Sequence, residues 1–422
     1  MEGYLVNFDK TRCFGCSACA AVCPKKVISM ERDEEGFYYP KVGEGCIDCG
    51  LCHKACPAEA MPRRFDEDKL AFGGYVKDAA VREESTSGGA FSALATAFYE
   101  KAAAEGKQCA IFGAESKGIQ VFHSYITDIA DLYKFRKSKY SQSVMGDAYA
   151  GCKKFLLKGH SVLFSGTPCQ IAGLKAFLRD GDYDGLLTVE VICEGVPTPH
   201  YMEKYDRMLE DKHGAPIREL DYRYTDATVR HGTPVKGKWD FQVMHTVLEN
   251  GTRVKTDRWF NPFWSIWLSH LMSRPSCYAC PFTTAARVAD VTLGDLWGVH
   301  LYCPELYGKN LGASLIVCNT QKGKDILSLA KKDMYGHELD FATALKYQSP
   351  MRRAISVNPD REDFMRDVQD PRITYTALVK KWGRKPTCKL LWQKYAWGNR
   401  QKIAFWNLKQ GVKKQRRKGD DA

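Results

Sequence analysis

The sequence lacks several features that would assign it to a common class. No stretch of its 422 residues approaches the ~18 consecutive apolar residues that a membrane-spanning helix needs. The first residues show no basic segment followed by an apolar one, the pattern of a secretory signal, so we expect a cytoplasmic protein. No G-x-G-x-x-G segment occurs, which leaves a Rossmann dinucleotide site without support. The 44% hydrophobic and 27% charged residues are typical of a globular chain.

The net charge of +12 belongs to the C-terminal tail. From Lys380 to Ala422 there are 14 basic and 2 acidic residues, and the rest of the chain is neutral. Four tryptophans accompany these charges: Trp382, Trp392, Trp397 and Trp406. One interpretation is a helical appendage that docks its tryptophans on the body. The alternative is a peripheral contact with the inner membrane face or with an acidic protein. Nucleic acid is disfavoured because nothing else in the chain indicates it.

Cysteine is concentrated near the N-terminus. Eight of the 17 cysteines form two copies of C-x2-C-x2-C-x3-C-P, about 33 residues apart. This is the bacterial ferredoxin pattern for two [4Fe–4S] clusters, in which the fourth cysteine of each run ligates the other cluster. A pair of zinc sites is the alternative, but zinc has no use for eight ligands in this order. The expected ligand sets are Cys13, Cys16, Cys19 and Cys56 for one cluster, and Cys46, Cys49, Cys52 and Cys23 for the other.

Downstream of Ser85, strands and helices alternate, which favours an α/β domain. The segment STSGG (85–89) precedes an Ala-rich helical stretch, and its free amides would suit a phosphate. An ordinary helix cap by Ser87 is the alternative. Strands are expected over 108–116 and 119–127, followed by the polar segment KSKYSQS (137–143), which by itself is uninformative.

Four further cysteines raise the question of a third metal site. Cys169 and Cys193 each follow an apolar strand, at the end where α/β sheets bind ligands. Cys277 and Cys280 form a C-x2-C pair followed by proline. Together these four are a candidate set of ligands for a third [4Fe–4S] cluster. Two buried structural thiols and half of a zinc site are the alternatives.

Five ordered motifs carry a family resemblance: SGGAFSAL (87–94), KYSQS (139–143), GTPCQIAGL (166–174), ICEGVPTP (192–199) and SCYACPF with DVTLGDLWG (276–298). They resemble the beta-subunit family of coenzyme F420-reducing hydrogenases and dehydrogenases, over roughly residues 85–357. The resemblance implies a non-Rossmann α/β fold that binds FAD, holds a nearby [4Fe–4S] cluster and passes electrons between clusters and a flavin or deazaflavin.

The resemblance also implies roles for particular residues. Ser87, Gly88 and Gly89 would contact the FAD diphosphate, and the same four cysteines would be the family's cluster ligands. The other residues expected on the flavin side are Lys139, Tyr140, Gln142, Thr167 and Asp295. Glu194 stands where family members often have histidine, and no catalytic acid is identified.

The expected organisation is an α+β ferredoxin module (1–62), a linker (63–84), a non-Rossmann α/β flavin and iron–sulfur domain (85–357) and a basic helical tail (358–422). The expected function is that of an iron–sulfur flavoprotein oxidoreductase that moves electrons between [4Fe–4S] clusters and FAD. From FAD they would reach a flavin, a deazaflavin or a small organic acceptor, with a redox protein or a small acceptor as partner. The alternatives are a non-enzymatic electron-transfer adaptor and, less favoured, a zinc-stabilised nucleic-acid module.

Overall fold

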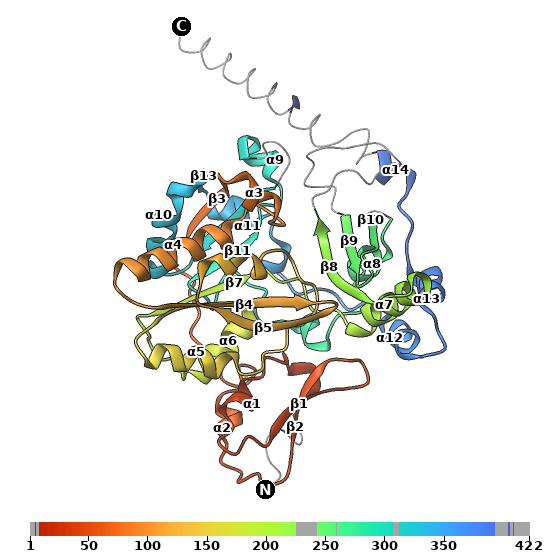
Figure 1. The fold of residues 1–422 in the computed structure, drawn as a ribbon, viewed down its shortest axis with the longest axis horizontal. Coiled ribbons are helices and arrows are strands. Elements are labelled where there is room, and N and C mark those ends of the chain that lie inside the picture. The colour runs from red at the N-terminus through yellow and green to blue at the C-terminus, as the bar shows by residue number, and fades with distance from the viewer. Residues whose placement is uncertain are drawn as a thin grey trace.

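The computed structural model describes residues 5, 8–224, 243–258, 260–306, 312–392, 404, 405 and 408. In this part of the chain the strands form three sheets of two, three and eight strands. Figure 1 shows the N-terminal module beneath helices α5 and α6, with the eight-stranded sheet above it and the three-stranded sheet to one side.

The N-terminal module is built from short elements. They are the 3-10 helix η1 (Lys10–Arg12), helix α1 (Ala18–Val22), the antiparallel strands β1 (Ile28–Arg32) and β2 (Tyr38–Val42), and helix α2 (Leu51–Lys54). Ala18 of α1 and Cys16 are buried in the same apolar cluster as Ile171 and Ala172 of α6. The module therefore shares its core with the larger domain.

The eight-stranded sheet has the order β13-β3-β12-β11-β7-β6-β4-β5. Its four central strands β11, β7, β6 and β4 are parallel, and the outer pairs are antiparallel. The strands are β3 (Leu70–Val76), β4 (Cys109–Lys117), β5 (Gln120–Ile126), β6 (Ser161–Gly166), β7 (Leu186–Val191), β11 (Val291–Asp295), β12 (Ser314–Cys318) and β13 (Met334–Leu339). The expected strands over 108–116 and 119–127 are confirmed as β4 and β5.

Helices cover both faces of this sheet, which is why strands such as β6 and β7 are almost continuously apolar. Side chains of α4 (Ala90–Ala104) and α10 (Gln321–Ala330) form one core with Leu163 and Leu187. Those of α5 (Ala148–Leu157) and α6 (Pro168–Phe177) form another with Val162 and Phe164. Shorter elements complete the layers: α3 (Ala79–Glu83), α9 (Val299–Tyr302), α11 (Phe341–Leu345), η2 (Ile129–Phe135), η5 (Lys331–Asp333) and η6 (Ser349–Met351). The α/β architecture is therefore as expected.

The expected linker over 63–84 is wrong in its central part. Residues 70–76 form β3, which lies inside the large sheet between β13 and β12. Gly73 and Gly74 permit the close approach of the neighbouring strands, because a Cβ atom at Gly74 would lie 2.5 Å from the Tyr335 carbonyl oxygen. The chain thus enters the sheet directly after the N-terminal module.

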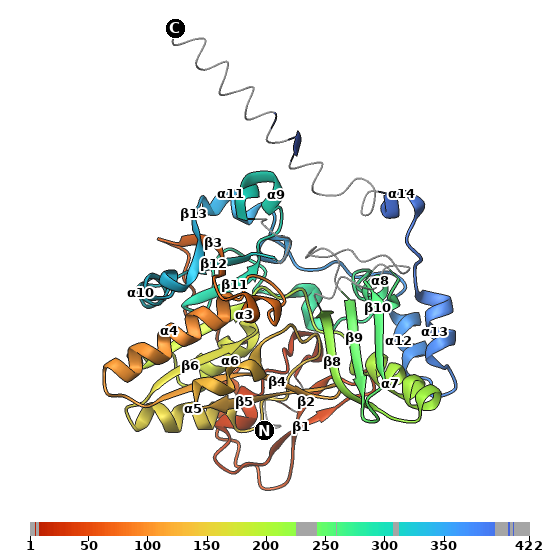
Figure 2. The ribbon, with the colours of Figure 1, turned by 45° about the horizontal axis from the view of Figure 1, so that its top comes forward.

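The three-stranded antiparallel sheet has the order β10-β9-β8 and stands beside the large sheet (Figure 2). Its strands are β8 (Ile217–Tyr224), β9 (Val243–Leu248) and β10 (Arg253–Asp257). An aromatic-rich core joins it to α7 (Pro199–His213), α8 (Pro262–Trp267), α12 (Arg361–Gln369) and α13 (Tyr375–Trp382). This smaller layer forms one side of the cavity described below.

Of the tail expected over 358–422, the structure describes residues 358–392, 404, 405 and 408. The expected start at residue 358 is wrong, because α12 and α13 bury Phe364 and Leu378 in the core and belong to the body. Trp382 docks on the body, where its indole Nε1 donates to Asp367 Oδ2 at 2.7 Å. Trp392, just beyond α14 (Cys388–Leu391), is 58% exposed. Trp397 and Trp406 lie outside the described residues. Across the described ranges, no helix has the length and apolar character needed to cross a bilayer.

Candidate iron–sulfur and flavin sites

The first expected ligand set comes together around α1. Cys13 follows η1, Cys16 lies just before α1, Cys19 lies in its first turn, and Cys56 follows α2. Burial, together with the nearby Cys13 and Cys56, raises the pKa of Cys19 to about 12. The backbone amide of Gly15 donates to the Cys13 thiol, as amides do to cluster sulfurs in iron–sulfur proteins. We call this group the proximal site.

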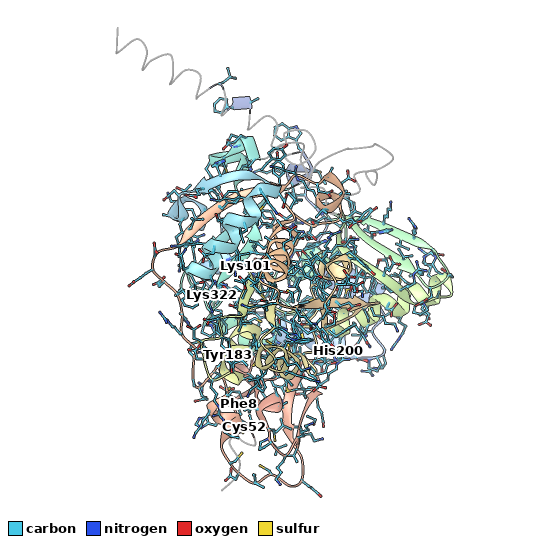
Figure 3. The ribbon with its side chains drawn as sticks, turned by 60° about the vertical axis from the view of Figure 1, so that its left-hand side comes forward. Phe8, Cys52, Lys101, Tyr183, His200 and Lys322 are labelled. Atoms are coloured by element: carbon cyan, nitrogen blue, oxygen red, sulfur yellow. The ribbon has the colours of Figure 1, made fainter. Side chains whose placement is uncertain are left out.

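The second expected set lies at the outer end of the module. Cys23, Cys46, Cys49 and Cys52 line one small cavity of about 50 Å³. Cys46 and Cys49 are exposed, unlike the buried Cys16. Figure 3 shows Cys52 far from the body of the large domain. We call this group the distal site. Cys56 therefore lies near Cys13 and Cys19, and Cys23 lies near Cys46, Cys49 and Cys52. The assignment of these cysteines to two clusters stays a prediction.

The third set comes from three separate segments. Cys169 lies in the first turn of α6 and Cys193 follows β7, so both stand at the carboxyl ends of adjacent parallel strands. Cys277 lies in η3 (Pro275–Ala279), and Cys280 directly follows it. All four thiols line one cavity of about 250 Å³. We call this group the third site.

The donor set of the third site suits a metal cluster. Burial raises the pKa of Cys277 to about 12 and that of Cys280 to about 11, and each thiol is affected by its neighbours. Four partly buried thiols in one cavity can become thiolates together only where positive charge compensates them, and bound iron would supply such charge. Among the described residues, no three His, Cys, Asp or Glu side chains are grouped to hold a single metal ion.

A cavity of about 600 Å³ opens between the large sheet and the three-stranded sheet. Seven of the eight residues expected to bind the flavin line it: Ser87, Gly89, Lys139, Tyr140, Gln142, Thr167 and Asp295. They come from the start of α4, the loop after η2, the end of β6 and the end of β11. The eighth, Gly88, does not line the cavity.

The turn before α4 explains the difference between these glycines. Gly88 is packed against β3 and β12, where an added Cβ would lie 2.4 Å from the Gly74 oxygen, and its amide donates to Ser314 Oγ. Gly89 is the N-cap residue of α4 in a left-handed conformation, with φ of 79° and no side-chain cap. Ser87 instead donates its hydroxyl to the Ala313 oxygen, so the alternative of an ordinary Ser87 cap is wrong.

The opposite wall carries an ion pair and several aromatic rings. Asp295 accepts from Arg223 of β8 at 2.7 Å, and Arg223 also reaches the Tyr140 hydroxyl at 3.4 Å. The Tyr140 ring stands edge-on to Trp264 and Trp267, at centroid distances of 5.2 and 4.8 Å. Sequence reasoning missed Arg223, Trp264 and Trp267, because isolated residues in a strand and a short helix carry no spacing signal.

Two other polar groups of the cavity have shifted pKa values. Burial lowers the pKa of Lys139 to about 8, and its ammonium donates to the Arg136 oxygen at 2.7 Å. Burial raises the pKa of Glu194, and the charge of Arg258 opposes that shift. The positive charges of Lys139, Arg223 and Arg258 in the cavity lining suit an anionic ligand.

The third site and the large cavity share a wall. Both are lined by Cys169, Cys193 and Glu194, and by the backbone from Gly195 to Val196. Thr167, which lines the large cavity, hydrogen-bonds with Cys169 Sγ at 3.2 Å. A planar ligand in the large cavity would therefore lie next to a cluster in the third site.

Two protein-family models match parts of the chain. Residues 12–64 match the model of a 4Fe–4S dicluster domain. Residues 159–341 match the model of the C-terminal region of the coenzyme F420 hydrogenase/dehydrogenase beta subunit. No curated protein matches the sequence. Among solved structures, a chain of the F420-reducing [NiFe] hydrogenase complex from Methanosarcina barkeri has 17% identity and a TM-score of 0.42, covering 69% of this chain and 90% of that chain. At those values this structural likeness carries no argument.

Proposed function

We propose that this chain is an iron–sulfur flavoprotein oxidoreductase related to the coenzyme F420 hydrogenase/dehydrogenase beta subunits. The proposal starts from the match of residues 12–64 to a 4Fe–4S dicluster domain and of residues 159–341 to the C-terminal region of those beta subunits. Two clusters occupy the proximal and distal sites, a third [4Fe–4S] cluster occupies the third site, and FAD occupies the large cavity. The shared wall between the third site and that cavity is the observation that carries the proposal.

Bound FAD supplies the exchange between one-electron and two-electron chemistry. The chain's own residues bind and orient it. The turn at Ser87 and Gly89 offers amides at the uncapped start of a 15-residue helix to the diphosphate. Lys139 adds positive charge, and the Arg223–Asp295 pair fixes the opposite wall. Tyr140, Gln142 and Thr167 complete the polar lining. FAD passes electrons to a flavin, a deazaflavin or a small organic acceptor. The clusters exchange electrons with a redox protein.

Anaerobic purification with analysis of iron, acid-labile sulfide and extracted flavin tests the proposal. Three cubane clusters predict about twelve irons and about twelve sulfides per chain, together with one FAD. About eight irons would remove the third cluster from the proposal. Clusters without flavin would favour the adaptor, which passes electrons to a separate catalytic partner and does no chemistry itself.

A matched pair of variants locates the third cluster. Cys193→Ser is expected to lower the iron content to about eight per chain while the two N-terminal clusters remain. Cys318→Ser is the control, because Cys318 is a buried thiol of β12 that lines none of the three cysteine sites and donates to the Gly323 oxygen of α10. Equal iron in both variants would contradict the assignment.

A further inference from the structure

Arg274 connects the N-terminal module to the large cavity. It is 1% exposed and directly precedes η3. Its guanidinium donates to the Cys13 oxygen at 2.8 Å, to the Tyr38 oxygen at 2.9 Å and to Gln142 Oε1 at 3.2 Å. It also lies over the Tyr39 ring, 4.3 Å from the centroid. One buried cation thus contacts the loop over residues 13–17, which carries Cys13 and Cys16 and which we call the proximal loop. It also contacts the β1–β2 hairpin and the wall of the large cavity.

Arg274 reaches two of the three cysteine sites. In the proximal site its guanidinium donates to the backbone oxygen of Cys13 at 2.8 Å. It also lines the cavity of the third site, and its backbone oxygen accepts from the Cys277 amide at 2.9 Å. Arg274 is not among the residues that line the distal cavity. The proximal and third sites therefore lie beside one buried positive charge that does not border the distal cavity.

The same region holds the proximal and third sites in contact. Phe14 lies between Cys13 and Cys16 and lines the cavity of the third site. Its ring packs edge-on against Phe282, with the ring centroids 5.3 Å apart. Gly173, one turn after Cys169 on α6, lies so close to Cys16 that an added Cβ would be 3.0 Å from its Sγ. Gly15 lies equally close to Arg274, because a Cβ added at Gly15 would be 2.9 Å from Arg274 Nη1. The proximal site is thus the part of the module nearest to the third site.

We propose that Arg274 is a positioning residue shared by the proximal and third clusters, which holds the proximal loop against the third site and raises the reduction potential of both clusters relative to the distal one. Electrons exchanged between a redox protein at the distal site and the flavin then pass through the proximal and third clusters in turn. Each transfer oxidises one cluster by one electron and reduces the next by one, with no proton required. The inference rests on the proposed function.

The physical reason is electrostatic. A reduced cluster carries one more negative charge than an oxidised one, so a nearby fixed cation stabilises the reduced form. An arginine keeps its charge at every pH that the protein tolerates. Its burial leaves little water to screen that charge, and its hydrogen bond to the Cys13 carbonyl brings it to the ligand loop itself.

The test is an anaerobic redox titration of the full chain, followed by electron paramagnetic resonance. Arg274→Met is expected to shift the midpoint potentials of the proximal cluster and of the cluster in the third site to more negative values. The midpoint potential of the distal cluster is expected to stay unchanged. Cys49→Ser identifies the signal of the distal cluster, which is the one expected to stay. Arg274→Lys keeps the charge without the forked hydrogen bonds and is expected to retain most of the potential, which keeps the test decisive if the methionine variant fails to fold.

Arg361 of α12 offers a matched control. It also ties the module to the large domain, through Glu35 at 2.5 and 2.9 Å and through the Ser273 oxygen. Arg361 lies 5.6 Å from the centroid of the Tyr278 ring, but it lines neither the third-site cavity nor the distal cavity. Arg361→Met is therefore expected to loosen the module and to shift the cluster potentials less than Arg274→Met does.

Three results would overturn the inference: unchanged potentials in Arg274→Met, an equal shift of all three clusters, or the same shift in Arg361→Met. Each would assign Arg274 a structural role alone. Failure of the proposed function is a different result, because it appears in the unaltered protein as about eight irons or as missing flavin. Unshifted potentials in a chain with about twelve irons and FAD would refute only the role of Arg274.

Discussion

A methyl group added at Gly173 should separate the N-terminal module from the large domain. Gly173 lies in α6, and a Cβ there would be 3.0 Å from both Cβ and Sγ of Cys16 and 2.8 Å from the Tyr149 hydroxyl. Neither neighbour moves freely, because Tyr149 donates to the Gln170 oxygen at 2.8 Å and is fully buried. Gly173→Ala therefore forces α1 away from α6.

The magnitude follows from two opposing effects. Overpacking of a well-packed contact costs about 1–3 kcal/mol. Replacement of a helical glycine by alanine returns about 0.5–1 kcal/mol. The expected net loss is about 0–2.5 kcal/mol, with a midpoint of about 1.3 kcal/mol, placed on the opening of the α1–α6 contact. At the midpoint the population of the open form rises roughly tenfold.

Hydrogen exchange of the anaerobic holoprotein measures this opening. Amides of α1 in Gly173→Ala are expected to exchange roughly ten times faster than in the unaltered chain, since exchange tracks the population of the open form. Gly151→Ala is the control, because Gly151 is also helical but its nearest neighbour, Phe112, lies at 3.5 Å. That variant should be slightly more stable. Unchanged α1 exchange in Gly173→Ala, or equal acceleration in Gly151→Ala, would refute the reasoning.

Three further predictions follow from the structure. FAD affinity, measured by flavin fluorescence, should fall as the pH rises through about 8, because Lys139 then loses its proton. The negative charges of Asp221 and Glu115 favour the protonated form of Lys139, and the positive charge of Lys137 opposes it. An unchanged pH profile in Lys139→Met would contradict the prediction. Glu190→Gln should cost about 3–5 kcal/mol in chemical denaturation, because the buried Arg287 loses its carboxylate partner; Glu338→Gln, which alters an exposed pair with Lys331, should change little, and equal losses would refute the distinction. If the tail contacts membranes, the full chain should sediment with anionic vesicles and a chain ending at 392 should not; no sedimentation of the full chain would end that interpretation.

Much of the candidate chemistry could be predicted because cluster ligands leave a spacing signature. The two N-terminal cysteine runs and the Cys277–Cys280 pair have fixed spacings, and the ends of β6 and β7 are recognisable from their apolar runs. The family motifs then pointed to seven residues of the large cavity. These features are local in sequence, and local patterns can be recognised from the sequence alone.

The remainder depends on contacts between distant segments. Arg274 has its partners in the first 40 residues and at Gln142, and nothing in its own neighbourhood indicates them. Strand β3 was hidden for a related reason. Gly73 and Gly74 are typical of a linker when seen alone, and only the adjacent strands β12 and β13 explain why small residues are needed there.

The position of β3 has a consequence for how the chain matures. It is made directly after the N-terminal module, yet its partners β12 and β13 come from residues 314–318 and 334–339. Strand β3 therefore cannot complete its pairing until residue 339 has been made. Such long-range pairing is intrinsically slow.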